Sequence, residues 1–270
     1  MTSYYTDLEI SSLTNPRIKN VVKLRQRSHR DKSNRMLIEG YREIKRAIDN
    51  GHSVEELFHC EAMFQGENNA KLLEECKAKG ATIIRCPANV FQKMSYRDRP
   101  DGLLVVAPQV QMHLKDLVLT PNPFIVIAEA IEKPGNLGTI LRSSDAAGVD
   151  AVIVCDRCTD INNPNVVRAS VGTLFSLPVI ETNSTDVIAW LKANNIQAVA
   201  TTPHTDKIYS DVDLTQGVAV VVGTEQYGLS KTWLKASELK VRIPMLGQAD
   251  SLNVASATTI LLYEVVRQRN

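Results

Sequence analysis

Short apolar runs alternate with amphipathic stretches along most of the chain, the pattern of strands separated by helices. In the second half, continuous apolar runs predict strands at Phe124–Ala128, Ala151–Cys155, Gln197–Ala200, Val218–Val222 and Leu239–Ile243. Helices are predicted between and after them, at about 137–147, 185–194, 229–236 and 253–268. Because these strands lack polar alternation, this half predicts a parallel sheet that is covered by helices on both faces.

The first half shows the same alternation in a less regular form. Strands are predicted at Met36–Glu39, Val54–His59, Ala81–Arg85 and Leu103–Ala107, and helices at Arg17–Ser28, from Gly40 to Ile48, and at Asn69–Lys79. Segment 108–122, with Pro108, Pro121 and Pro123 in or beside it, is expected to be a linker. The chain is therefore predicted to be an α/β protein with a smaller domain at 1–107 and a larger one at 123–270.

Composition places the chain among ordinary globular proteins, with 44% apolar and 23% charged residues. No apolar run reaches the 18 or so residues that a membrane span needs, and Met1–Ile10 lacks the basic start and apolar stretch of a signal peptide. The five cysteines are an odd number without a disulfide framework spacing. These features lead us to expect a cytoplasmic protein without a membrane partner.

The net charge of +1 conceals a basic segment near the N-terminus. Between Pro16 and Arg35, eight basic residues stand against one acidic residue, Asp31. Such a segment is typical of binding to a phosphate backbone, although a solvated helix face would show the same charges. The RNA-binding candidates are Arg17, Lys19, Lys23, Arg25, Arg27 and Arg30, with Arg168 added from the second half.

Ligands of parallel α/β sheets bind outside the carboxyl ends of the strands, so the loops that follow the strands are the places to look for a site. After the first strand of the second half, Asn136 is placed to cap a helix, and Arg142 projects one turn beyond Gly138. An arginine there offers a fork of donors to a phosphate or carboxylate. Alone, however, a capping asparagine and a surface arginine are common features.

Two later loops carry further polar candidates. Glu225 lies between Gly223 and Gly228 directly after a buried strand, where it could handle a proton or complement a helix dipole. Ser251 and Asn253 stand at the start of the last helix, as N-caps or as part of a pocket wall.

The Cys155-x-x-Cys158 pair has no second pair and no suitably spaced histidines, so no metal site is expected.

Taken together, these motifs carry a resemblance that no single one carries. Asn136-x-Gly-x-x-x-Arg142, Gly223-x-Glu-x-x-Gly-Leu229 and Ile243-Pro-Met followed by Ser251-Leu-Asn-Val resemble the three motifs of the SpoU (TrmH) branch of SPOUT-class RNA methyltransferases. Asn163–Gly172 and Leu177-Pro178 are similar to the family's middle segment, so that the resemblance covers about 124–268. Residues 10–107 are similar, more loosely, to the L30e-like substrate-binding domain of the rRNA-modifying members. The strand end Ala128–Ile131 and Thr224 depart from the usual pattern.

The resemblance implies a SPOUT domain with a deep trefoil knot, a homodimer, and S-adenosylmethionine as the methyl donor for a ribose 2′-hydroxyl in RNA. It assigns cofactor binding to Thr201, Thr202, Gly223, Ile243, Met245, Leu252 and Asn253. It assigns catalysis to Asn136, Arg142, Glu225, Ser251 and Asn253. Large-subunit (23S) rRNA is the favoured substrate, with tRNA methylation or a non-catalytic rRNA-binding or ribosome-assembly role as alternatives.

The sequence does not identify the general base that removes the proton of the ribose hydroxyl. The family proposal gives this role to Arg142, but a guanidinium is protonated in nearly all proteins. In the alternative, Arg142 holds the adjacent phosphate while Glu225 or water accepts the proton. A Rossmann-type methyltransferase is disfavoured because no glycine-rich loop follows the first strand.

Overall fold

The computed structural model describes residues 8–270, which divide into two compact units. Unit 1 contains the chain up to Val110 together with Asn162–Ser176, and unit 2 contains Gln111–Ile161 and Leu177–Asn270. Most of the N-terminal segment Met1–Ile10, used above to exclude a signal peptide, lies outside the described residues. No helix within 8–270 is both long enough and apolar enough to cross a membrane.

The observed division differs from the predicted one in segment 162–176, which the sequence placed with the larger domain. The segment is held in unit 1 by hydrogen bonds. The Val110 amide donates to Asn162 Oδ1 over 2.8 Å, and Arg46 Nη1 donates to the Val171 carbonyl over 2.7 Å. Residues 111–122 are more than a linker, because Met112, Leu114, Leu117 and Leu119 pack against the core of unit 2.

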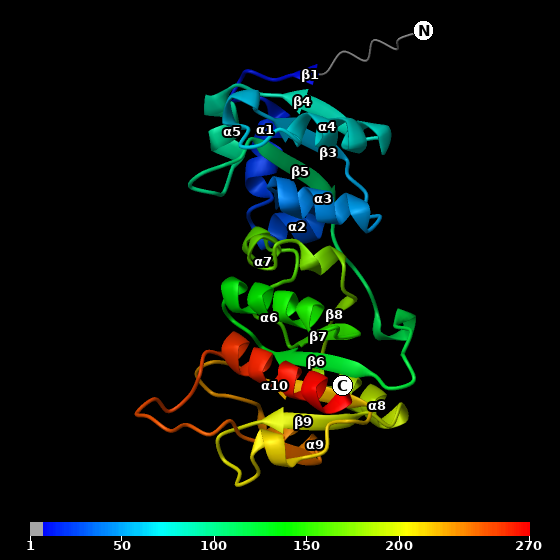
Figure 1. The fold of residues 1–270 in the computed structure, drawn as a ribbon. Coiled ribbons are helices and arrows are strands. Elements are labelled where there is room, and N and C mark those ends of the chain that lie inside the picture. Colours follow the sequence, from blue (N-terminus) through cyan, green and yellow to red (C-terminus); the bar gives the residue numbers. More distant parts are fainter. Residues whose placement is uncertain (1–7) are drawn as a thin grey trace. The chain divides into compact units, whose positions relative to one another are not determined.

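Unit 1 is built on a five-stranded mixed sheet (Figure 1). Its strand order is β1 (Leu8–Glu9), β4 (Thr82–Arg85), β3 (Glu56–His59), β5 (Leu103–Pro108), β2 (Arg35–Glu39). Its helices are α1 (Pro16–Lys23), α2 (Arg27–Ser33), α3 (Tyr41–Asp49), α4 (Asn69–Ala78), α5 (Ala88–Met94) and α7 (Pro164–Ala169), with short 3₁₀ turns at Glu61–Met63 and Thr173–Phe175. The strands predicted from apolar runs are all present, whereas β1, α5 and α7 were not predicted.

The helix predicted at Arg17–Ser28 is wrong in its extent, because it breaks into α1 and α2. The break leaves backbone carbonyls without helical partners. Arg30 satisfies two of them from a buried position, since its Nη1 donates to the carbonyls of Leu24 (3.0 Å) and Arg25 (2.9 Å). The basic segment therefore has an inward-facing member that its charge pattern did not reveal.

Unit 2 contains a six-stranded sheet in which all neighbouring strands are parallel. Its order is β11 (Leu239–Val241), β9 (Gln197–Thr201), β10 (Val218–Val222), β6 (Phe124–Glu129), β7 (Ala151–Cys155), β8 (Val179–Thr182). The helices are α6 (Pro134–Ala146), α8 (Ser184–Ala193), α9 (Lys231–Ala236) and α10 (Val254–Arg269), with 3₁₀ turns at Leu114–Asp116 and Tyr209–Asp211. The parallel sheet and its five predicted strands are confirmed, and β8 was missed.

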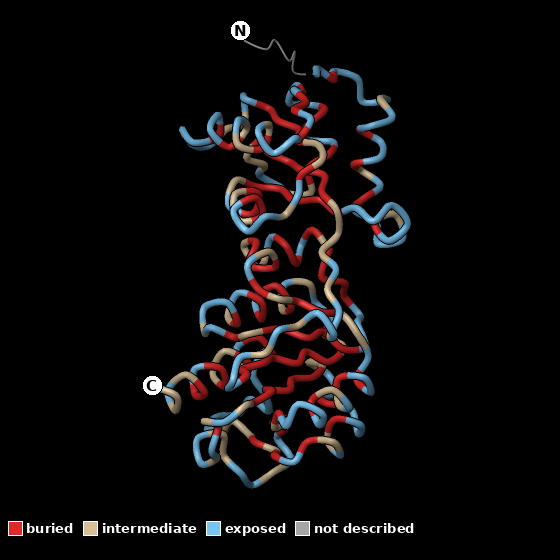
Figure 2. The backbone as a smooth tube through the Cα atoms, turned by 90° about the vertical axis from the view of Figure 1, so that its right-hand side faces the viewer, coloured by how far each residue is buried: buried red, intermediate tan, exposed pale blue. Residues whose placement is uncertain are grey.

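The core of unit 2 lies on both faces of this sheet, whose strands are buried almost throughout (Figure 2). One face, with Ile125, Ile153 and Val221, packs against Val187 of α8 and Trp233 of α9. Helices α6 and α10 lie side by side (Figure 1), and α10 also contacts β10. Burial on both faces explains why these strands read as unbroken apolar runs.

Candidate active site

A cavity of about 480 Å³ opens beyond the carboxyl ends of the unit 2 strands. The strand order changes direction at β6, with β9 and β10 on one side of it and β7 and β8 on the other. The cavity lies to one side of β6, because its walls include the segments after β9, β10 and β11, and ligands of parallel α/β sheets bind outside the carboxyl ends of the strands. The walls include six of the seven residues predicted to bind a cofactor: Thr201, Thr202, Gly223, Ile243, Met245 and Leu252. Glu225 and Ser251 of the predicted catalytic set also line it.

The loop after β10 is a tight turn that requires glycine at Gly223. The Thr224 amide donates to the Gly228 carbonyl over 3.1 Å, and the Gly228 amide donates to the Thr224 carbonyl over 3.0 Å. This closure brings Gly228 so near that a Cβ on Gly223 would lie 2.3 Å from its carbonyl oxygen. A side chain at Gly223 would therefore force the turn open.

A buried carboxylate at the end of β6 anchors the far end of the same loop. Glu129 is 5% exposed, and its Oε2 accepts a hydrogen bond from the Ser230 amide over 2.8 Å. Ser230 is the N-cap of α9, and its hydroxyl accepts from the Trp233 amide. The strand end that departs from the usual motif thus has a structural purpose: it ties β6 to the loop that carries Glu225.

Three predicted catalytic side chains form a hydrogen-bonded chain beside the cavity. Asn253 Nδ2 donates to Asn136 Oδ1 over 3.1 Å, and Asn136 Nδ2 donates to Glu225 Oε1. Asn253 is also the N-cap of α10, where its Oδ1 accepts from the Ala255 amide over 3.0 Å. The chain fixes the orientation of the half-buried Glu225 carboxylate. Asn253 itself does not line the cavity.

The prediction that Asn136 caps a helix is wrong. Helix α6 begins at Pro134 with Lys133 as its N-cap, because proline is favoured at the first helical position. Asn136 consequently lies inside the first turn, and its amide is directed at Glu225 rather than at its own backbone.

The structure does not bring Arg142 into the cavity wall of its own chain. Arg142 is exposed on α6, and its guanidinium makes no hydrogen bond or ion pair with any residue in 8–270. Six helical positions separate it from Asn136, which places the two side chains about 9 Å apart along the axis and on different sides of the helix.

Several polar groups at the cavity lack partners within the described chain. Thr201 Oγ1 is buried without a hydrogen bond, and the main chains of Gly223, Ile243 and Leu252 make none to another described residue. The Thr202 hydroxyl, in contrast, already has a partner within the protein, because it accepts a hydrogen bond from the His204 amide over 3.2 Å. A polar ligand could satisfy the unpaired groups.

Sequence reasoning left some wall residues without a role, above all His204 in the loop after β9 and Tyr227 in the loop after β10. His204 follows a buried strand, which is the signal that located the other loops. Tyr227 lies within a recognised motif but at a position that the motif does not specify.

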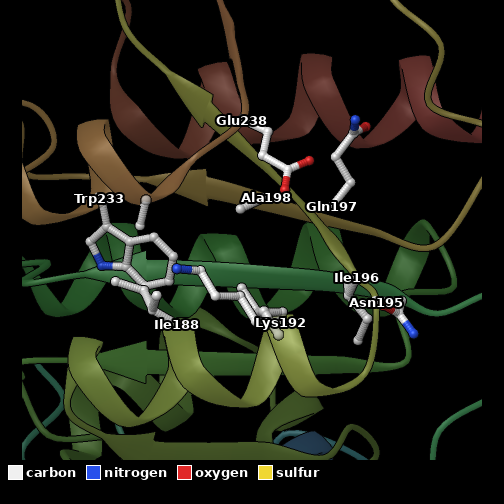
Figure 3. Close-up of a pocket in the computed structure, with 10 residues that line it drawn as sticks. Ile188, Lys192, Asn195, Ile196, Gln197, Ala198, Trp233 and Glu238 are labelled. Atoms are coloured by element: carbon white, nitrogen blue, oxygen red, sulfur yellow. The ribbon is translucent and has the colours of Figure 1, made fainter.

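A second cavity in unit 2, of about 320 Å³, lies at the opposite, amino-terminal end of β9. Figure 3 shows side chains from α8, β9, α9 and the segment after α9, including Lys192, Trp233 and Glu238. None of the predicted site residues lines it. It is therefore separate from the loops that carry the motifs.

The predicted RNA-binding residues all lie in unit 1, but they are not equivalent. Lys19 and Lys23 are exposed on α1, and Arg168 is exposed on α7. Arg17 and Arg27 face acidic neighbours, Glu56 at 3.6 Å and Asp31 at 3.5 Å, in exposed pairs that contribute little. Arg25 donates to the carbonyls of Lys93 and Ser95. Arg30 differs from the other candidates, because it is 1% exposed and its guanidinium bonds backbone carbonyls.

The two cysteines of the Cys155-x-x-Cys158 pair lie in different environments. Burial raises the pKa of the Cys155 thiol to about 12, so it stays protonated within the strand, whereas Cys158 is exposed. Within residues 8–270, no cluster of three or more His, Cys, Asp or Glu side chains could hold a metal ion.

Comparisons with known proteins agree with this geometry over both units. The profile of the SpoU rRNA Methylase family matches residues 123–263, and that of the MRM3-like substrate binding domain matches residues 15–105. The chain is 33% identical to a 23S rRNA (uridine(2479)-2′-O)-methyltransferase of Streptomyces viridochromogenes, over 91% of this chain and 87% of the relative. It is 28% identical to a 23S rRNA (guanosine(2553)-2′-O)-methyltransferase of Bacillus subtilis, over 95% of this chain and 98% of the relative.

A solved structure resembles the whole chain. The AdoMet-bound rRNA methyltransferase from Sinorhizobium meliloti superposes with a TM-score of 0.88 at 32% identity. The match covers 96% of this chain and 97% of that one.

Proposed function

The chain belongs to the SpoU rRNA Methylase family, and from that premise we propose that it transfers a methyl group from S-adenosylmethionine to a ribose 2′-hydroxyl of 23S rRNA. The observation that carries the proposal is the convergence of three strand-end segments on one cavity beside the Asn253–Asn136–Glu225 chain. Two relatives that match over both units are named 23S rRNA 2′-O-methyltransferases, which favours rRNA over tRNA.

The residues at the cavity fit S-adenosylmethionine. Ile243, Met245 and Leu252 supply an apolar wall for an adenine ring and thioether carbons, and the unpaired Thr201 hydroxyl supplies a polar contact. The free main-chain groups of Gly223, Ile243 and Leu252 can bond the polar edges of the cofactor. Once bound, the cofactor supplies a methyl group that is already activated by the positive sulfonium.

The remaining task of the protein is to align the ribose oxygen and to remove its proton. We assign proton acceptance to Glu225 or to a water that it orients, because the Asn136 amide holds one carboxylate oxygen and leaves the other available. Asn253 fixes Asn136 in turn. Ser251, on the cavity wall, is assigned to hold the ribose or the cofactor. Arg142 is assigned to the phosphate next to the target ribose, because its guanidinium offers a fork of hydrogen-bond donors.

A homodimer would explain where Arg142 acts. Its guanidinium is exposed and does not line its own cavity, so a second copy of the chain is a suitable recipient. The knot implied by the family resemblance and a cytoplasmic location are part of the same proposal. Mixing Arg142→Ala with Glu225→Gln protein should restore part of the activity if each site draws these residues from two chains. It should restore none if both come from one chain.

Unit 1 is proposed to hold the rRNA. It matches a substrate-binding domain and carries the exposed cations Lys19, Lys23 and Arg168. Phosphate contacts of this kind position RNA without reading its sequence.

The decisive experiment incubates the purified protein and S-adenosylmethionine with total RNA from cells that lack this gene. Ribose methylation is then mapped across 23S rRNA, 16S rRNA and tRNA. A single new 2′-O-methyl nucleotide in 23S rRNA, absent with Glu225→Gln, is expected. Modification of tRNA alone would replace the proposed substrate, and cofactor binding without any methylated RNA would favour a non-catalytic role.

A further inference from the structure

An unusually exposed aromatic side chain stands at the rim of the cavity. Tyr227 is 78% exposed although the protein is poor in aromatic residues, and it belongs to the wall of the cavity. No other Phe, Tyr or Trp among the described residues lines this cavity. Tyrosine is enriched at binding surfaces, because its ring can pack on a partner while its hydroxyl stays in water.

The backbone that carries Tyr227 is fixed without the help of its side chain. The Tyr227 amide donates to Thr224 Oγ1 over 2.9 Å, inside the turn closed by the two Thr224–Gly228 backbone bonds. At the far end, Glu129 holds Ser230. A ring on a rigid turn can accept a flat partner with little loss of conformational entropy.

The chemistry of the target nucleotide brings a nucleobase to this point. The base is attached to C1′ of the ribose, and C1′ is bonded to the C2′ that carries the reacting hydroxyl. Tyr227 is two residues from Glu225, which is assigned to that hydroxyl. Proteins that recognise structured RNA commonly bind unstacked bases of loops and bulges, whose faces stack on aromatic side chains.

We propose that Tyr227 is the stacking platform for the base of the target nucleotide, a substrate-positioning role that rests on the proposed function. The ring provides the contact, whereas the phenolic hydroxyl is dispensable. Because every base has a flat π face, the platform holds the nucleotide without selecting which base it is.

Three variants separate stacking from other roles: Tyr227→Phe keeps the ring, Tyr227→Leu keeps apolar bulk, and Tyr227→Ala keeps neither. Each is assayed for kcat/KM with 23S rRNA from cells lacking the gene, for cofactor affinity by calorimetry, and for oligomeric state by sedimentation. Tyr263→Ala, at a 49% exposed tyrosine on α10 outside the cavity wall, is the matched control.

We expect Tyr227→Phe and Tyr263→Ala to stay within about twofold of the unmodified protein. The Leu and Ala variants should lose about 5- to 150-fold in kcat/KM, the range for removal of one base–aromatic stack. Their cofactor affinity and oligomeric state should be unchanged.

The proposal is overturned if Tyr227→Leu matches Tyr227→Phe, since bulk alone would then suffice. It is also overturned if Tyr227→Ala is fully active, weakens cofactor binding or dissociates an oligomer. Failure of the unmodified protein to methylate any RNA would instead refute the proposed function, so the two failures are distinguishable.

Discussion

Gly223→Ala tests the cavity at the point where backbone packing is tightest. The added Cβ would lie 2.3 Å from the Gly228 carbonyl oxygen and 2.6 Å from the Leu229 nitrogen. Ordinary contact begins at 3.4 Å, so the backbone at Gly223 and the backbone at Gly228 must move apart by about 1 Å. The obstructing atoms are backbone, which cannot rotate away as a side chain could.

Separation on this scale breaks both backbone bonds between Thr224 and Gly228. Each contributes about 0.5–1.5 kcal/mol to stability, so the free energy of unfolding should fall by about 1–3 kcal/mol. The functional loss should be larger, because a displacement of about 1 Å near reacting groups costs on the order of 100-fold in rate. Glu225, two residues away, would move with the turn.

Calorimetric titration with S-adenosylmethionine and thermal unfolding measure the two effects. Cofactor affinity should fall at least about tenfold, while the protein remains folded at 25 °C. Gly135→Ala is the matched control, because nothing lies within 4 Å of a Cβ at that exposed position in the first turn of α6. If Gly223→Ala bound the cofactor as tightly as Gly135→Ala, the cavity would not be the cofactor site.

Three further predictions address other parts of the molecule. Arg142→Lys keeps the charge but loses the fork, so kcat/KM for rRNA should fall about tenfold or more at unchanged cofactor affinity; near-full activity would refute bidentate phosphate binding. Arg30→Ala should lower the free energy of unfolding by about 2–4 kcal/mol, whereas Lys23→Ala should leave stability unchanged and reduce the salt slope of RNA binding by about one. In the native protein at pH 8, a thiol reagent should label Cys158 and not Cys155, whose raised pKa keeps it protonated; equal labelling would contradict the buried position.

The sheet of unit 2 was predictable because strands that are buried on both faces consist of continuous apolar runs, which can be recognised in the sequence. Ala151–Cys155 and Val218–Val222 match the prediction at both ends. Strand β8 was missed because it has only four residues and two of them are half-buried. The family resemblance assigns eight of the twenty cavity-wall residues, and the strand-end rule points to the loops that carry most of them.

Other features depend on contacts between segments that are distant in sequence. The Arg30 side chain points inward because it bonds backbone carbonyls that are left without helical partners where the helix breaks. The Asn136 side chain is oriented by its hydrogen bond to Glu225, which lies 89 residues later in the sequence. The charge and spacing of residues in the sequence do not identify hydrogen-bond partners that are brought together only by the fold. The same limit applies to Arg142, whose partner lies outside its own chain under the proposal above.

The placement of Asn162–Ser176 in unit 1 means that the polypeptide crosses between the units three times, after residues 110, 161 and 176. One proteolytic cut within 108–122 would leave the halves joined by two intact covalent connections. A fragment ending near Val110 would also lack α7, which contacts the edge strand β2. If the gene segment that encodes the chain up to Val110 were fused end to end to another enzyme, the transferred module would therefore lack Asn162–Ser176, which belongs to unit 1.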